Sequence, residues 1–241
     1  MTKIYANDYL NIIEEKGKNI FTINFVYQNA VLINSLLKTR IILGGTSSED
    51  YKILKFKAQT VKTFSQFKED YKCKRGNSKI SINDSLIILT NLSQQLDYII
   101  KMYSKTFIGY NPENIIVIND SQFIYLGCQY LSEIYDNEMT LISCPFNQIE
   151  VFPSPELLNI NEIPSYIHYK TSYFSLSLFL LYILTNDDEK YNDYLKENQH
   201  FLRFAKIDEW LKILHIKYTK LYFLLSRSLV EEPTSRNILF I

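Results

Sequence analysis

The segment Phe107–Asp120 holds the residues whose types and spacing are most suggestive of chemistry. It places Asn111, Glu113 and Asn114 directly before a run of four aliphatic residues. Polar side chains that lead straight into a strand are typical of a functional loop. The first part of the segment differs, because it contains apolar side chains and Gly109 instead of an acid or a base. The segment is therefore either a working site or the remains of one.

Motifs of the common enzyme classes are absent from the sequence. It contains neither of the two glycine-rich phosphate-binding patterns, no Gly-x-Ser-x-Gly elbow and no His-Glu-x-x-His pair. The three cysteines and three histidines lack the spacing of a disulfide framework or a zinc site. The pair Gly44-Gly45 is more typical of a turn than of a phosphate cradle. We therefore expect no metal site.

The elements that must position the segment can be predicted from periodicity. Apolar runs at 114–118 and 122–126, separated by Asn-Asp-Ser, predict a tight hairpin. Asn83 or Asp84 is expected to cap a preceding helix. Its apolar residues recur at three- and four-residue steps, as Leu86, Leu89, Leu92, Leu96, Ile99 and Tyr103. A loop over 145–164, a buried helix over 173–184 and a helical region over 210–229 are expected to follow.

The first eighty residues predict mixed structure. Strands are expected at 19–27, 40–45 and 51–57, and a helix at 60–72. The run at 30–38 fits either a strand or a helix. A strand-rich front followed by a helical back predicts an α+β fold.

Four segments, in order, resemble motifs of eukaryotic-type protein kinases. "FIGYNPENIIVINDSQFIYLG" at 107–127 resembles the catalytic loop and the hairpin after it. "PSPEL" at 153–157 resembles the Ala-Pro-Glu that ends the activation segment, and the helical run at 168–186 resembles the buried helix after it. "EEPTSR" at 231–236 resembles the Asp-Pro-x-x-Arg near the end of the kinase domain. The composition of the chain and the sequence of its segment 154–176 are also similar to those of divergent kinase-like proteins of large DNA viruses.

The resemblance implies one two-lobed protein kinase-like domain, with a small strand-rich N-lobe and a mainly helical C-lobe. It divides the chain into a divergent N-lobe-like region at 1–82 and a C-lobe-like region at 83–241. The motifs lie in the second region, and the first matches the family only in outline.

Carried over residue by residue, the resemblance implies a degenerate catalytic loop. Gly109 stands at the place of the aspartate that accepts the proton of the substrate hydroxyl. Phe107 and Ile108 stand at the neighbouring His and Arg places, and Asn111 at the place of the loop lysine. Asn114 matches the asparagine that holds a second magnesium ion.

The metal-binding aspartate is also missing. The Asp-Phe-Gly of the family is matched by Tyr125-Leu126-Gly127, and no Asp or Glu occurs between Ser121 and Ser132. Asp120 is too close to Asn114 to replace it. Magnesium is therefore not expected, because the ion requires carboxylate or phosphate oxygens in an octahedron.

The resemblance implies that a structural ion pair survives. Glu156 and Arg236 match the glutamate and arginine whose buried pair anchors the activation segment to the helical lobe. The aspartate that opens the buried helix is replaced by Ser172, which predicts weaker support of the loop.

A nucleotide site in the first region has fewer candidates. Lys55 or Lys57 could match the lysine that contacts the ATP phosphates, with Glu69 as its partner. Alternatively, all three are exposed charges of a strand and a helix. No glycine-rich loop is found, so ATP binding stays open.

The sequence favours a catalytically impaired, pseudokinase-like protein that binds a protein partner or acts allosterically. Two alternatives remain: a divergent active serine/threonine kinase that recruits Glu113 or Glu133 for metal, and a structural protein without a nucleotide site. Losing the base, the loop lysine and the metal aspartate together should leave little phosphoryl transfer, since one general base alone contributes about 10²- to 10⁴-fold.

Charge and hydropathy limit the partners. The 26 basic and 26 acidic side chains give a net charge of zero, which predicts no general attraction to nucleic acid or to anionic membrane. The basic cluster Lys72, Lys74 and Arg75 is expected in a solvated loop. The most hydrophobic segment, at 173–184, is shorter than the roughly twenty residues of a transmembrane helix. We expect an intracellular protein of the reducing cytoplasm, that of a host if the protein is viral.

Overall fold

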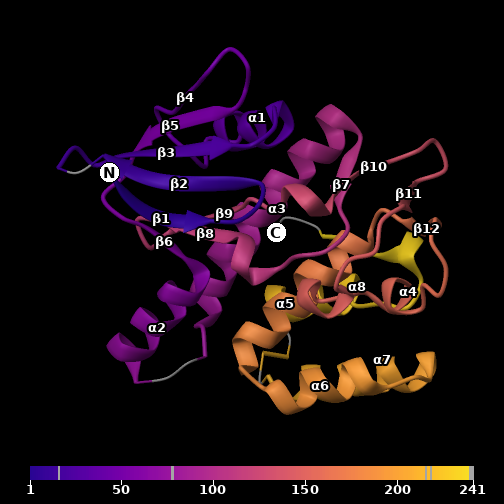
Figure 1. Cartoon of the computed structure of the whole chain (residues 1–241). Coiled ribbons are helices and arrows are strands. Elements are labelled where there is room, and N and C mark those ends of the chain that lie inside the picture. The colour runs from indigo at the N-terminus through magenta and orange to yellow at the C-terminus, as the bar shows by residue number, and fades with distance from the viewer. Residues whose placement is uncertain (16, 77–78, 215, 218, 239–241) are drawn as a thin grey trace.

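An antiparallel five-stranded sheet forms the front part of the protein (Figure 1). The structure is a computed structural model, and it describes residues 1–15, 17–76, 79–214, 216–217 and 219–238. The strands follow one another across the sheet in the order β1 (Thr2–Ala6), β2 (Leu10–Glu15), β3 (Ile20–Phe25), β5 (Ile53–Lys57) and β4 (Thr46–Ser47). The strands predicted at 19–27 and 51–57 are confirmed as β3 and β5.

Helix α1 (Ala30–Lys38) resolves the ambiguous run between the predicted strands. Its N-cap is Asn29, whose side-chain oxygen accepts a hydrogen bond from the Leu32 amide at 3.1 Å. Apolar residues bury one side of the helix, which packs against the later helix α3. The strand predicted at 40–45 is wrong, because Arg40 and Gly44 have φ angles of 60° and 66° and turn the chain out of an extended path.

The predicted hairpin is confirmed as β8 (Ile115–Ile118) and β9 (Gln122–Tyr125). Asn119 and Asp120 both have positive φ angles, of 52° and 57°, and the Ser121 amide closes the turn by donating to the Ile118 carbonyl at 3.2 Å. A third strand, β6 (Val61–Thr63), pairs with β8. Strand β6 occupies the first residues of the segment that was predicted as a helix at 60–72.

Helix α2 (Phe64–Arg75) follows β6 directly, because Thr63 and Gln66 form a reciprocal capping box. The basic cluster at 72–75 therefore lies in the last helical turn, and its assignment to a loop is wrong. The N-cap of helix α3 (Ile82–Tyr103) is Ser81, two or three residues before the predicted caps Asn83 and Asp84: the Ser81 hydroxyl accepts a hydrogen bond from the Asp84 amide at 3.1 Å.

The back part is helical and is built around helix α5 (Thr171–Thr185), whose side chains are all buried except those of Tyr173 and Tyr182, which are half-buried. Around it lie α6 (Asp188–Lys196), α7 (His200–Ile213) and α8 (Lys220–Ser228) (Figure 1). The predicted helical region at 210–229 is thus the end of one helix and the whole of another. Within the described residues, no helix combines the length and apolar character needed to cross a bilayer.

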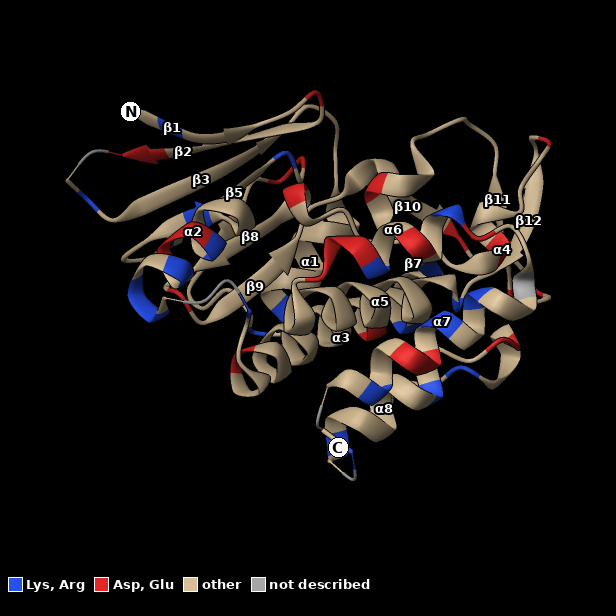
Figure 2. Ribbon diagram, turned by 90° about the horizontal axis from the view of Figure 1, so that it is seen from below, with Lys and Arg blue, Asp and Glu red and all other residues tan. Residues whose placement is uncertain are grey.

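Short elements connect the two parts. β7 (Lys105–Phe107) pairs with β10 (Leu131–Glu133), and β11 (Met139–Ile142) pairs with β12 (Ser165–His168). The region expected as a loop at 145–164 also contains the 3-10 turn η3 (Gln148–Val151) and helix α4 (Pro155–Leu158). Acidic and basic residues occur in both parts (Figure 2). The described structure is therefore α+β, with a sheet-rich front and a helical back.

Candidate functional site

The loop between β7 and β8 is closed around a buried tyrosine. Tyr125, at the end of β9, donates a hydrogen bond from its hydroxyl to the Gly109 carbonyl at 2.9 Å and accepts one from the Asn111 amide at 3.0 Å. Its ring lies 4.7 Å from those of Phe107 and Tyr110, measured between ring centroids. Burial raises the pKa of Tyr125 well above its ordinary value. The side chain therefore stays neutral, and it holds the loop together instead of binding metal.

Gly109 has no room for any side chain. A Cβ atom at this position would lie 2.6 Å from the Cβ of Val151 and 2.8 Å from the main-chain oxygen of Val151. Ser175 fixes this approach, because its hydroxyl accepts from the Tyr110 amide at 2.9 Å and donates to the Val151 carbonyl at 2.5 Å. A carboxylate at position 109 would need the whole of η3 to move.

The oxygen of Asn114 is already occupied. Its Oδ1 accepts hydrogen bonds from the Tyr5 hydroxyl at 2.9 Å and from the Asn7 side-chain amide at 3.2 Å. Asn7 is held in turn by its own oxygen, which accepts from the amides of Tyr9 and Leu10 at 2.9 Å each. The turn between β1 and β2 therefore closes onto the one metal-binding side chain that the sequence suggested.

Asn111 has a structural use in the loop. Its side-chain oxygen accepts from the Glu113 amide at 2.9 Å and caps the 3-10 turn η1 (Pro112–Asn114). Glu113 is exposed, and Glu133 lies 3.4 Å from the ammonium group of Lys105. The described residues contain no group of three or more acidic, His or Cys side chains that could hold a metal ion.

The residues predicted to bind nucleotide are not brought together. Lys55 points to the exposed face of β5, where its ammonium group lies 2.6 Å from the Glu15 carboxylate. Lys57 is exposed on the same face, and Glu69 is exposed on α2. The predicted partner relation of Glu69 is not formed, because Lys55 pairs with Glu15 and α2 packs against β6 and β8.

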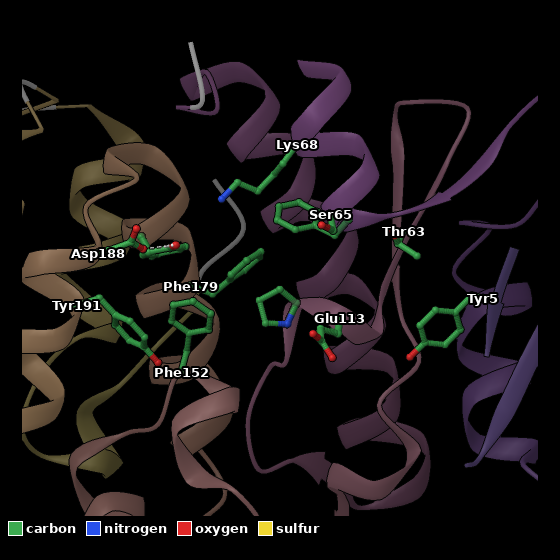
Figure 3. A pocket seen from close by; sticks show the side chains of 12 residues that line it. Tyr5, Thr63, Ser65, Lys68, Glu113, Phe152, Phe179, Asp188 and Tyr191 are labelled. Carbon is green, nitrogen blue, oxygen red and sulfur yellow. Dashed lines mark hydrogen bonds between the residues drawn. The ribbon is translucent and has the colours of Figure 1, made fainter. Parts of the chain in front are cut away.

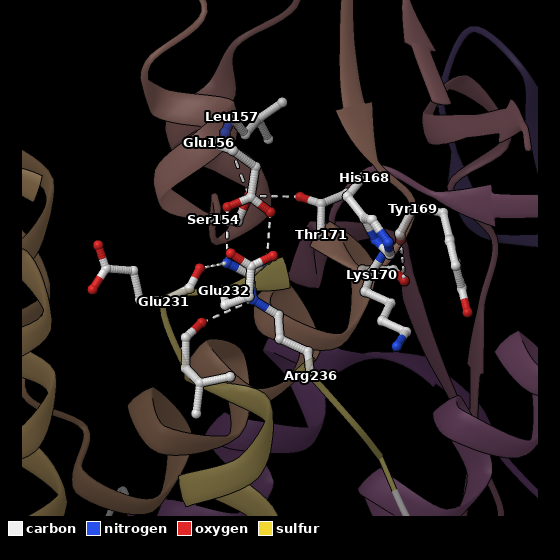
Figure 4. Close-up of polar contacts among 12 residues, drawn as sticks. Ser154, Glu156, Leu157, His168, Tyr169, Lys170, Thr171, Glu231, Glu232 and Arg236 are labelled. Atoms are coloured by element: carbon white, nitrogen blue, oxygen red, sulfur yellow. Dashed lines mark hydrogen bonds and ion pairs between the residues drawn. The ribbon is translucent and has the colours of Figure 1, made fainter. Parts of the chain in front are cut away.

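Glu156 and Arg236 form the predicted buried ion pair (Figure 4). The second guanidinium nitrogen of Arg236 lies 3.0 Å from the Glu156 carboxylate, and the arginine is 1% exposed. It also donates to the main-chain oxygens of Val230 and Glu231, at 3.0 and 3.1 Å. The predicted consequence of Ser172 differs: its hydroxyl bonds the Tyr169 carbonyl, and Ser175 supports the loop instead.

A cavity of about 570 Å³ opens beside the loop (Figure 3). Its wall is aromatic, formed by Phe152, Phe179, Tyr182 and Tyr191. Lys68 reaches in from α2, with its ammonium group 3.0 Å from the Asn186 side-chain oxygen and 5.3 Å from the Tyr182 ring centroid. Burial lowers the pKa of Lys68. Glu113 and Asp188 also line the cavity. It has the size of a ligand site, and its aromatic wall can hold an apolar or aromatic group.

Sequence reasoning did not identify Tyr5, Asn7, Val151 or Ser175 as parts of this site. Each acts through a contact with a distant segment, and none belongs to a local motif. No protein-family model matches the chain, and no curated protein matches it.

Proposed function

We propose that the protein is a degenerate, protein kinase-like protein that acts by binding a protein partner and does not transfer phosphate. The order of its elements supports this proposal. Three antiparallel strands are followed by a helix, a further strand pair and the short strand β6. Two helices and β7 come next, and then the loop and hairpin that carry the resemblance. The Glu156–Arg236 pair adds a contact that the resemblance implied before any geometry was considered.

The observation that carries the functional proposal is the packing of Val151 against Gly109. Phosphoryl transfer depends on positioning and on electrostatic stabilisation by charged groups. Here the place of the base is closed by an aliphatic residue, and the place of the metal aspartate is taken by a neutral phenol. The one remaining carboxamide oxygen, on Asn114, already accepts two internal hydrogen bonds.

A phosphotransfer assay tests the loss of activity. The protein is incubated with radiolabelled ATP, with and without magnesium, and both autophosphorylation and transfer to a generic basic protein are measured. We expect no transfer above a heat-denatured control. Magnesium-dependent transfer that disappears in Asn114→Ala would overturn the proposal. Loss of such transfer in Glu113→Gln or Glu133→Gln would identify a recruited carboxylate and an active kinase.

A thermal-shift titration with ATP separates the remaining alternatives. A stabilisation by ATP that does not depend on magnesium supports a nucleotide-binding pseudokinase, because ligand that binds the folded state raises the melting temperature. Absence of a shift supports a protein that uses the fold without nucleotide. In either case the partner surface is expected in the helical part, around residues 152–173.

A further inference from the structure

A groove of about 930 Å³ opens beside the Glu156–Arg236 pair, with Glu156 in its lining. All four residues of β12 line one wall. The other walls come from the segment that follows α4 and from Glu231, Glu232 and Pro233, at the start of the 3-10 turn η4 (Pro233–Ser235). The groove therefore runs along a strand that has only one partner, β11.

The free edge of β12 offers unpaired main-chain groups to the groove. Bonded and non-bonded residue pairs alternate in an antiparallel ladder. Tyr169 donates to the Glu138 carbonyl at 2.9 Å, so Ile167 bonds to β11 and the main-chain groups of Tyr166 and His168 point away from it. None of the described residues hydrogen-bonds these outward groups. An extended chain can add to such an edge as a further strand.

The groove is acidic. Its described lining contains Glu156, Glu162, Glu231 and Glu232 and no Lys or Arg. Arg236 neutralises Glu156 from beneath (Figure 4), and the nearby Lys170 donates to the Thr234 carbonyl at 2.7 Å. Glu162 is exposed, and no hydrogen bond or ion pair to a described residue involves it.

Aromatic surface accompanies these carboxylates. Tyr166 is 56% exposed and Tyr135 is 43% exposed, although their rings pack edge to face with centroids 6.1 Å apart. Tyrosine faces attract guanidinium and ammonium groups. Open main-chain groups, carboxylates and the face of Tyr166 at one groove, with Tyr135 packed beside that ring, match an extended segment that carries Arg or Lys.

We propose that this groove binds an extended, basic segment of a partner protein, which adds to β12 as a strand. The proposal rests on the proposed function in that it specifies where the partner binds and its chemistry. Main-chain hydrogen bonds to Tyr166 and His168 supply affinity, and Glu162 and Glu232 select basic side chains at alternate positions of the added strand.

Fluorescence anisotropy with the whole protein tests this inference. The probe is a short fluorescein-labelled peptide in which Arg alternates with Thr and Val. Two matched peptides are compared with it: one with Glu in place of Arg, and one with N-methyl groups on alternate amides. We expect saturable binding of the first probe only, because the others lose the charge match or the main-chain donors. Equal binding of all three peptides, or no binding, would overturn the proposal.

Two charge reversals locate the site. Glu162→Lys should weaken binding of the Arg probe by about five- to tenfold, as expected for replacing an attractive cross-strand charge by a repulsive one. Glu49→Lys, an equally exposed reversal on the turn before β5, should leave binding unchanged. Equal effects of the two reversals would show attraction to net charge alone and contradict the groove.

The tests of groove and function fail separately. Phosphotransfer with intact probe binding would overturn the proposed function and keep the groove. If neither phosphotransfer nor probe binding is observed, the proposed loss of catalysis stands and the proposed binding groove is wrong. Sedimentation completes the set: if the protein self-associates and Glu162→Lys dissolves the dimer, the occupant is a second copy of this chain and not a basic partner.

Discussion

Two buried polar sites in the protein are built in opposite ways. At the Glu156–Arg236 site, a full charge pair is enclosed and every guanidinium nitrogen has a partner. At the loop that follows β7, the polar groups are neutral, and the phenol of Tyr125 links main-chain atoms of Gly109 and Asn111. Charge is thus present where it holds α4 to the segment of Arg236, and it is absent from the hydrogen bonds that close the loop. The loop around Gly109 is a closely packed structural element.

The largest expected effect is at the ion pair. Arg236→Met leaves the Glu156 carboxylate without its partner and should lower the free energy of unfolding by about 3–5 kcal/mol. Urea denaturation monitored by circular dichroism measures it. Arg227→Met, at an exposed position of α8, is the matched control and should change stability by less than about 0.5 kcal/mol.

The two variants must differ for the comparison to hold. A similar small loss in both would mean that the pair contributes as little as a surface salt bridge. The contrast between a charged site and a neutral site would then have no energetic meaning.

Gly109→Ala tests the packing of the loop against Val151. The added Cβ overlaps Val151, so we expect a loss of about 3 kcal/mol, at the upper end of overpacking effects. Gly109→Asp should be at least as costly and should not produce phosphotransfer. The same denaturation experiment measures both.

A double-mutant cycle identifies the contact. Val151→Gly removes the side-chain atoms nearest to position 109, so Gly109→Ala should cost less in that background than alone. Strict additivity of the two losses would show that the cost arises elsewhere.

Tyr125→Phe removes two buried hydrogen bonds and leaves the Gly109 carbonyl and the Asn111 amide without partners. The expected loss is about 1–3 kcal/mol. An unchanged melting temperature would show that the phenol does not hold the loop.

Tyr110→Phe should have the smallest effect, with the opposite sign. The Tyr110 hydroxyl is buried, and no described residue hydrogen-bonds it. Removing it should therefore raise the free energy of unfolding by about 1 kcal/mol. Since Tyr110 and Tyr125 lie 4.7 Å apart between ring centroids, this variant is the matched control for Tyr125→Phe. Destabilisation by both would contradict the assignment of the hydrogen bonds.

The local elements were predictable where periodicity and turn chemistry agree. The helix at 82–103, the buried helix at 171–185 and the hairpin around Asn119 follow from residue spacing and from the residues that tolerate positive φ. The strand predicted at 40–45 failed because turn conformations outweighed a short apolar run. β11 and β12 were not expected, since their pairing joins segments with no hairpin signal between them.

For the candidate site, the sequence predicted which charged residues are missing and which ion pair is present, but it did not predict the contacts that close the loop. The absence of acids at Gly109 and Tyr125 is visible in the sequence, and so is the pairing of Glu156 with Arg236 once the resemblance is noticed. The side chains that close the loop in place of the missing acids cannot be identified from the sequence. Val151, Ser175 and Tyr5 reach the loop from distant segments, and each uses an ordinary side chain that no motif marks.

The hydrogen bond between Tyr5 and Asn114 spans 109 positions of the chain. During synthesis the first hairpin therefore leaves the ribosome long before its acceptor exists, and the final position of β1 is set late. Closing a loop of this length costs more entropy than closing a local turn, so we expect the contact to form after the local helices and hairpins. Once formed, it ties β1 to the turn that precedes β8, so we expect the front sheet and the β8–β9 hairpin to melt in one transition.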